Sequence, residues 1–300
     1  MIQMRSYQSE EDFLLMQNLI RENYIHSDRQ LYPSPSDLDY WRYIYDESPD
    51  GVQGAKLWHD DNGQILAFAW MNEDAVDFVC HYQHKALQNE IIEWSEQERL
   101  KNVSENIVNC FYVFDCDSEG EFIAERKGYR RSEIFNYYGK RYLREEIPKA
   151  QLPLGYTIKS IETDEEVRKR AEMNELAGNE ITPDKYKYFM KHAVTYRQEL
   201  DLIAVAPNGD VAGFCTVWFD SVCKIGMFEP YAVHFDHLRK GLGKSLLLEG
   251  MNRLLSLGCR TVYVTHAGLE SDESDPALAL NEAVGFHKVG NNYMWLKRLP

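Results

Sequence analysis

The sequence lacks the features that mark membrane, secreted and metal-bound proteins. No apolar run approaches the ~18 to 20 residues that a membrane-spanning helix needs, and no apolar signal-peptide core follows the first residues. The six cysteines include no C-x-x-C pair, and none clusters with histidines. We therefore expect reduced thiols in a cytoplasmic protein, with neither a disulfide framework nor a metal site.

Basic residues are also scarce. The 300 residues include 33 Lys and Arg against 48 Asp and Glu, which gives a net charge of −15. Such a chain repels nucleic-acid phosphates and anionic membrane surfaces, so we expect neither as a partner, and its field favours cationic small molecules. With 44% hydrophobic and 13% aromatic residues, the chain can still fill the cores of two ordinary domains.

Each half of the chain begins with the same pattern for the start of a helix. A short alternating segment leads to a hydroxyl residue, and a carboxylate follows three positions later. This spacing resembles the capping box that opens many helices. The two pairs are Ser9 with Asp12 and Thr163 with Glu166.

Two further landmarks follow in the same order in both halves. Asn-Gly pairs at residues 62–63 and 208–209 separate apolar runs and predict β-hairpins, because both residues tolerate positive φ. A helix then ends at Gly128 or Gly285, and an aromatic-rich strand follows. We therefore predict two copies of one α/β unit, joined at the proline-interrupted residues 147–153.

The two copies differ between the hairpin and the final helix. The first copy has no glycine between residues 64 and 119, whereas residues 241–243 of the second read Gly-Leu-Gly between an apolar strand and a helical pattern. The amides of such a loop and the positive end of the helix dipole converge on one anion. The run that ends at Ser245 resembles part of a P-loop, but Leu238 stands where that motif needs glycine. The sequence predicts an anion site in the second copy alone.

Residues 155–300 resemble the GNAT superfamily of N-acetyltransferases, and residues 1–150 resemble it more weakly in the same element order. The acyl-CoA signature of the family is Q/R-x-x-G-x-G/A. Residues 238–243 supply both of its glycines, with Leu238 in place of the usual Arg or Gln. Residues 229–234 resemble the fourth strand of the family and the exit from it.

The resemblance implies an α/β (α+β) fold with two tandem GNAT-like domains. Each would be a mixed, mostly antiparallel sheet flanked by helices. Residues 1–150 would form a degenerate domain without a CoA loop, and residues 151–300 the domain that binds acetyl-CoA. This architecture resembles two-domain GNAT enzymes such as mycothiol synthase.

The resemblance also implies acetyl-CoA as the co-substrate, without a metal. Its diphosphate would bind the main-chain amides of residues 239–244, and its pantetheine arm would add to the edge of the fourth strand. Asn281, which stands where the family commonly has a tyrosine acid, would contact the CoA sulfur or the pantetheine. The residues expected to bind the co-substrate are Ala232, Val233, Leu238, Arg239, Lys240, Gly241, Leu242, Gly243, Lys244, Ser245 and Asn281.

Glu229 is the candidate catalytic base, and Tyr231 is a candidate acid or a wall of the acceptor site. A base is needed because an ammonium group has no lone pair with which to attack a thioester. Strand alternation puts Glu229 and Tyr231 on one face unless Pro230 introduces a bulge. His234 and His266 are alternative titrating groups, and each can also be an ordinary surface histidine.

The sequence thus predicts an enzyme that moves an acetyl group from acetyl-CoA to a primary amine of a small, cationic molecule within a ternary complex. Two other functions stay open: an acyl-CoA-binding sensor without turnover, and a protein or peptide N-acetyltransferase. One aromatic-rich segment is expected in the core, with an acceptor platform as the alternative; it contains Tyr40, Trp41, Tyr43 and Tyr45.

Overall fold

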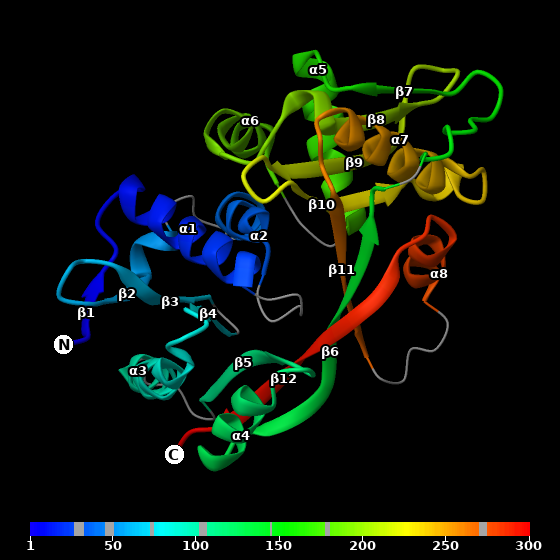
Figure 1. Ribbon diagram of the computed structural model, residues 1–300. Helices are drawn as coiled ribbons and strands as arrows, with labels where there is room; N and C mark the ends of the chain where they lie inside the picture. Colours follow the sequence, from blue (N-terminus) through cyan, green and yellow to red (C-terminus); the bar gives the residue numbers. More distant parts are fainter. Residues whose placement is uncertain are drawn as a thin grey trace.

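The computed structural model describes residues 1–26, 33–45, 51–72, 75–101, 107–144, 146–177, 181–269 and 275–300. Figure 1 shows two α/β units connected by long strands that run between them. The first half contains β1 (Gln3–Ser6), α1 (Glu10–His26), α2 (Pro35–Tyr40), β2 (Lys56–His59), β3 (Ile65–Met71), β4 (Val76–Cys80), α3 (Gln88–Lys101), β5 (Val108–Phe114), α4 (Ser118–Arg126) and β6 (Arg130–Tyr142).

The second half repeats the element order of the first. It contains β7 (Thr157–Ser160), α5 (Asp164–Glu172), α6 (Pro183–His192), β8 (Asp201–Val205), β9 (Val211–Asp220), β10 (Ile225–Val233), α7 (Leu242–Ser256), β11 (Thr261–Leu269), α8 (Pro276–Ala283) and β12 (His287–Arg298). Short 3₁₀ and π segments lie between some of these elements. The internal repeat predicted from the sequence is confirmed in the order of helices and strands.

The strands form two sheets that do not divide at the middle of the chain. One sheet has the order β1-β2-β3-β4, and the other has the order β5-β12-β6-β11-β10-β9-β8-β7. Strand β6 of the first half pairs with β11 of the second, and β12 lies between β5 and β6. Each half therefore gives its last strand to a sheet that it shares with the other half. Figure 1 shows β6 and β12 running side by side between the units.

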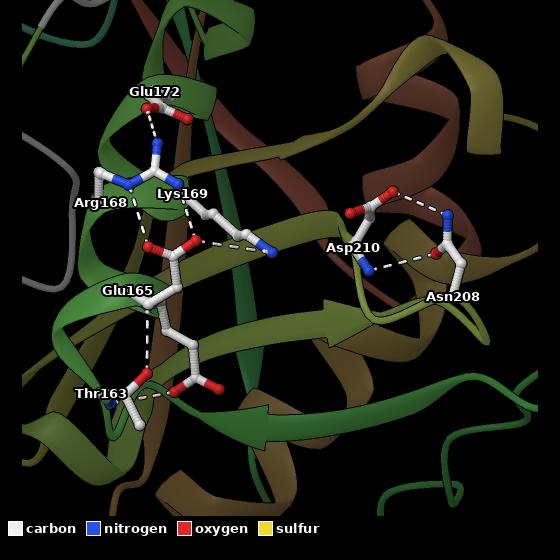
Figure 2. Close-up of polar contacts among 8 residues, drawn as sticks. Thr163, Glu165, Arg168, Lys169, Glu172, Asn208 and Asp210 are labelled. Atoms are coloured by element: carbon white, nitrogen blue, oxygen red, sulfur yellow. Dashed lines mark hydrogen bonds and ion pairs between the residues drawn. The ribbon is translucent and has the colours of Figure 1, made fainter.

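The predicted hairpins are present in both halves. Gly63 has a φ of +83° between β2 and β3, and Gly209 has a φ of +87° between β8 and β9. Glycine is favoured at both positions because a side chain in this region of φ is strained. In the second hairpin the Asn208 side chain also bonds both the main chain and the side chain of Asp210 (Figure 2).

The two predicted capping boxes have different outcomes. At α5 the box is confirmed, because Thr163 Oγ1 accepts from the Glu166 amide at 3.2 Å and the Glu166 carboxylate accepts from the Thr163 amide at 3.1 Å. Figure 2 shows Thr163 at this end of α5, followed by Arg168, which bridges Glu165 and Glu172. The Asp12 carboxylate at α1 instead accepts two bonds from the Arg5 guanidinium, at 2.7 and 2.6 Å.

Helices cover both faces of the sheet in the second half. On one face α7 and α8 enclose a core that includes Leu247, Met251 and Phe286. On the other face α5 and α6 pack over a second core. Tyr43 of the first half is 3% exposed and belongs to that second core, so the two halves share buried surface. No helix in the described ranges is long and apolar enough to cross a membrane.

Candidate active site

Strands β10 and β11 separate part-way along their length. They pair in parallel only as far as Phe228 opposite Val264, and the described residues beyond that point form no pair between these strands. β10 stays paired with β9 up to Val233, and β11 stays paired with β6 up to Leu269. The edge of β10 over residues 229–233 is therefore open to an extended ligand that adds as a strand.

A β-bulge lies where these two strands separate. Between Phe228 and Tyr231 the pairing of β10 with β9 shifts by one residue, and the peptide bond between Glu229 and Pro230 is cis. The bulge interrupts the alternation of side chains. Tyr231 packs against the core under α7 and α8, whereas Glu229 faces a cavity on the side of the first half. The two candidate catalytic residues therefore do not share one strand face, because Pro230 does lie in a bulge.

Glu229 lies in the wall of a cavity of about 660 Å³ between the two halves. The Tyr40 phenol from α2 hydrogen-bonds the Glu229 carboxyl, and Asp37 of the same helix acts on it electrostatically. Burial, and next the charge of Asp37, raises the pKa of Glu229 to about 8. A carboxyl group with this pKa accepts a proton from an ammonium group only in its ionised fraction, which grows as the pH rises toward 8.

Tyr231 and Asn281 form a pair on the opposite side of the bulge. The Tyr231 phenol donates to Asn281 Oδ1 at 3.0 Å. Burial raises the pKa of Tyr231 well above its usual value, so the phenol stays protonated and remains a donor. Asn281 is fully buried, and its Nδ2 has no hydrogen-bond partner in the described chain. This unpaired donor is suited to an acceptor atom of a ligand bound beside β10.

The predicted anion loop lies directly before α7. Gly241 is the N-cap of α7 with a φ of +78°, and the first amides of a helix have no partner within it. A Cβ on Gly243 would lie 3.0 Å from the Leu280 side chain of α8 and 3.6 Å from that of Val233 of β10. Glycine therefore lets α7 begin in close contact with both elements. Exposed residues surround the cap, namely Leu238, Arg239, Lys240, Gly241 and Lys244.

Two of the predicted co-substrate residues are already engaged inside the protein. The Ser245 hydroxyl donates to the Gln151 carbonyl at 2.8 Å, its amide donates to the Gly241 carbonyl, and the residue is 2% exposed. Both of its donors therefore face the interior, and a role of Ser245 in binding the co-substrate stays a prediction. Lys240 Nζ donates to the Tyr156 phenol at 3.2 Å and to a main-chain carbonyl. Its side chain therefore links the loop to the segment that connects the two halves.

The other titrating candidates lie away from the cavity. His266 bonds Asp275, the N-cap of α8, and neither residue lines the cavity that contains Glu229. His234 stacks on Phe235 and accepts a bond from the Asp236 amide. Both histidines are therefore held by local contacts, while Glu229 faces the space in which an acceptor can bind.

The loop of the second half has no equivalent in the first. There α3 follows a 3₁₀ turn (Lys85–Leu87), and Lys85 forms an ion pair with Asp117 at 2.7 Å. Over residues 64–119 no described residue has a positive φ. In the second half, Gly241 at the N-cap of α7 has one. The first half therefore lacks the backbone shape that exposes successive amides to an anion.

Sequence reasoning missed the first-half and C-terminal residues that line the cavity. Asp37, Asp77 and Asn292 come from α2, β4 and β12 and line one cavity although they lie far apart in the chain. Tyr40 and Trp41 also line the cavity, so the aromatic segment contributes to the cavity wall as well as to the core. The side chain of Tyr45 lies outside the described residues.

Residues 164–286 match the profile of the acetyltransferase (GNAT) family. This part of the chain is a GNAT acetyltransferase domain. The match includes the separated strands and the loop before α7, and the protein is accordingly an acyltransferase that uses acyl-CoA as co-substrate. No curated protein sequence matches the chain.

Solved structures extend the likeness from the GNAT domain to the whole chain. A GCN5-related N-acetyltransferase from Sphaerobacter thermophilus is 19% identical with a TM-score of 0.68, covering 99% of this chain and 95% of its own. A tandem GNAT protein from the clavulanic acid biosynthesis pathway is 15% identical with a TM-score of 0.65, covering 99% of this chain and 98% of its own. N-myristoyltransferase of Saccharomyces cerevisiae is 11% identical with a TM-score of 0.59, covering 98% and 80%. These likenesses confirm the tandem GNAT fold.

The GNAT domain has groups that fit an acyl-CoA. The first amides of α7 suit the diphosphate, and the free edge of β10 at Ala232 and Val233 suits the amide groups of a pantetheine arm. The unpaired Nδ2 of Asn281 suits an acceptor atom near the thioester. Leu242 is buried with Val233 in a small core cluster, so its amide and not its side chain would serve the ligand.

Proposed function

We propose that the protein transfers an acetyl group from acetyl-CoA to a primary amine of a small, cationic molecule, by direct attack within a ternary complex. One observation supports this most strongly: the open edge of β10 has the anion loop at one end and Glu229 in an acidic cavity at the other. The two substrates could thus meet at the bulge.

In this proposal Glu229 takes a proton from the ammonium group of the acceptor. The free amine attacks the thioester carbonyl, a C–N bond forms, the C–S bond breaks, and the sulfur leaves as a thiolate. As the amide forms, its nitrogen gives up a second proton; Tyr231 is the proposed acid that donates its own proton to the thiolate and takes up this one in exchange. An amide of residues 232–233 would polarise the carbonyl, since donors aimed at a developing oxyanion stabilise the transition state.

The two halves have different proposed roles. Residues 151–300 would bind acetyl-CoA through Arg239, Lys240, Lys244 and the amides between them. Residues 1–150 would form a degenerate unit that supplies much of the acceptor cavity. A cytoplasmic location is part of the proposal and is supported by six free cysteines.

The deciding experiment is a panel of amines assayed for thiol release from acetyl-CoA. The panel should contain polyamines, amino sugars, amino-acid derivatives and lysine-containing peptides. We expect release with small cationic amines and none with a Gly243→Glu variant, which serves as the control for the loop. Release with peptides alone would make the protein a peptide acetyltransferase, and no release with any amine would favour an acyl-CoA sensor.

A further inference from the structure

The cavity that contains Glu229 is larger than a single amine requires. Its volume of about 660 Å³ falls within the range of pockets that enclose small-molecule ligands. Its lining comes from α2, β4, β5 and β6 of the first half and from β10, β11 and β12 of the second. Asp37 and Tyr40 act on Glu229, whereas Asp77 and Asn292 of this lining have no part in the proposed attack.

The lining is acidic and aromatic. It contains the carboxyl groups of Asp37, Asp77 and Glu229, and no Lys, Arg or His is present among its described residues. Aromatic faces attract cations within about 6 Å of the ring centre. Four aromatic side chains line this cavity, namely Tyr40, Trp41, Tyr112 and Tyr138.

Asn292 gives an independent sign that a ligand binds here. Its side chain is 7% exposed and lies in the cavity wall. Its Nδ2 donates to the Tyr138 phenol at 3.4 Å, but its Oδ1 receives no bond from the described chain. A buried acceptor without a donor is costly, so this oxygen points to a ligand that donates hydrogen bonds.

The acidic groups are arranged for an organic cation rather than for a metal ion. Within the described ranges no three His, Cys, Asp or Glu side chains are placed to hold a metal. Asp37 acts electrostatically on Asp77 and on Glu229, so the three carboxyl groups form one acidic lining that extends from β4 to β10. Asp77 is held in its orientation by the Asn72 amide, which donates to it at 2.9 Å. A molecule with separated positive groups matches this distribution.

We propose that the acceptor is an oligoamine whose second ammonium group is held by Asp77 and Asn292 while the first meets Glu229. This inference rests on the proposed function and narrows its substrate class. An ammonium group has three donors and no acceptor, so it can satisfy the Asp77 carboxylate and Asn292 Oδ1 together. Hydrogen bonds between charged groups are the strong ones, which makes the second charge a determinant of specificity. The first half of the chain thereby selects the acceptor.

Calorimetric titration with spermidine in the absence of acetyl-CoA tests this inference. We expect spermidine to bind the full chain and to bind an Asp77→Asn variant at least tenfold more weakly. Asp210→Asn, which removes the same charge at an exposed turn, should bind spermidine as the original chain does. Octylamine, of similar length with one ammonium group, should bind weakly and equally to all three proteins.

Three results would overturn the inference: no spermidine binding, equal binding of spermidine by Asp77→Asn, or equal binding of the two amines by the original chain. If Asp77→Asn fails to fold, Asn292→Asp provides the second test. That variant adds a carboxylate beside Tyr138 and should tighten spermidine binding, and unchanged or weaker binding would contradict the proposal.

Turnover measured with the same proteins separates this inference from the proposed function. Spermidine binding that depends on Asp77, without thiol release from acetyl-CoA, supports the subsite and contradicts the proposed acetyl transfer to a small cationic amine. The opposite result is thiol release at the same kcat/KM with octylamine and with spermidine, with both values the same in Asp77→Asn. That result supports the transferase role and removes the subsite.

Discussion

Over the residues that the structure describes, the two halves share one order of ten helices and strands, yet only the second has a left-handed N-cap before its central helix. In the first half, a 3₁₀ turn and the Lys85–Asp117 ion pair occupy the equivalent place. Strand β4 of that half contributes instead to the wall of the acidic cavity, through Asp77. The comparison teaches that a repeated fold can lose one binding site and still supply part of the site of its partner.

The strand next to the separation also differs between the halves. Counted from their first residues, Cys80 ends β4 at the position that Glu229 has in β10, and β10 then continues through its bulge to Val233. We expect Glu229→Gln to lower kcat by about 10²- to 10⁴-fold, because a positioned base contributes about that much. Cys80→Ser should leave the rate within a factor of about three. Steady-state kinetics on both variants checks this contrast, and a similar loss in both would show that Glu229 acts only through the fold.

The pH profile sharpens the assignment of Glu229. The group faces Asp37, whose charge raises its pKa, and Tyr40, whose hydrogen bond lowers it, with a net pKa of about 8. Since a base must be ionised, the component of the pH profile that Glu229 controls should show kcat/KM rising with pH up to about 8 and constant above it. Glu229→Gln should lose this component and keep only the titration of the acceptor amine. A profile that is unchanged in the variant would assign the base to another group.

The loop gives the next largest contrast. Gly243 is the second residue of α7, and Asn89 is the second residue of the equivalent helix α3. Gly243→Glu adds a charge and a Cβ that meets the Leu280 side chain at 3.0 Å, so acetyl-CoA affinity should fall by about 100-fold or more. Asn89→Glu adds the same charge in the first half and should leave the affinity unchanged. Calorimetry with acetyl-CoA measures both, and weaker binding in Asn89→Glu alone would move the site to the other half.

Stability should depend on pH through carboxyl groups from both halves. Burial raises the pKa of Asp37 to about 6, of Asp77 to about 7 and of Glu229 to about 8. The folded state therefore keeps protons that the unfolded chain releases above about pH 4, and the free energy of unfolding should fall as pH rises from about 4 to 8.

Removing one of these carboxyl groups should reduce the decrease in the free energy of unfolding between about pH 4 and 8. We expect Glu229→Gln to be more stable than the original chain at pH 8.5 by on the order of 1–3 kcal/mol, with a smaller difference at pH 5. Asp77→Asn should act in the same direction by less, because the raised pKa of its carboxyl is lower. Urea unfolding at several pH values measures this, with Asp210→Asn as the exposed control. A difference that grows toward low pH would have the wrong sign.

Local features of the fold could be predicted from the sequence, and distant ones could not. Turns at Gly63 and Gly209 depend on a few neighbouring residues, so a short pattern was sufficient. The exchange of β6 and β12 was not visible, because strand pairing joins residues far apart in the chain and leaves no local pattern.

The residues of the candidate site also differ in whether a local sequence pattern marks them. Gly241 and Gly243 could be recognised from their spacing, since their role depends on backbone shape before one helix. Asp77 and Asn292 line the same cavity as Glu229 although they lie far from it in the chain. The internal contact of Ser245 could not be predicted, because the sequence does not show that the segment connecting the halves packs on α7 and accepts a hydrogen bond from its hydroxyl.

The smallest expected contrast is at the first helix of each half, where the sequence has the same pattern and the structure has two solutions. Thr163 closes a reciprocal capping box, so Thr163→Ala should cost about 1 kcal/mol of stability. At α1 the Asp12 carboxylate binds the Arg5 side chain and the Gln8 amide, so Ser9→Ala should cost less than about 0.5 kcal/mol. Chemical denaturation of the two variants measures the difference. Equal losses would mean that Ser9 caps α1 as Thr163 caps α5, and that the two halves begin alike after all.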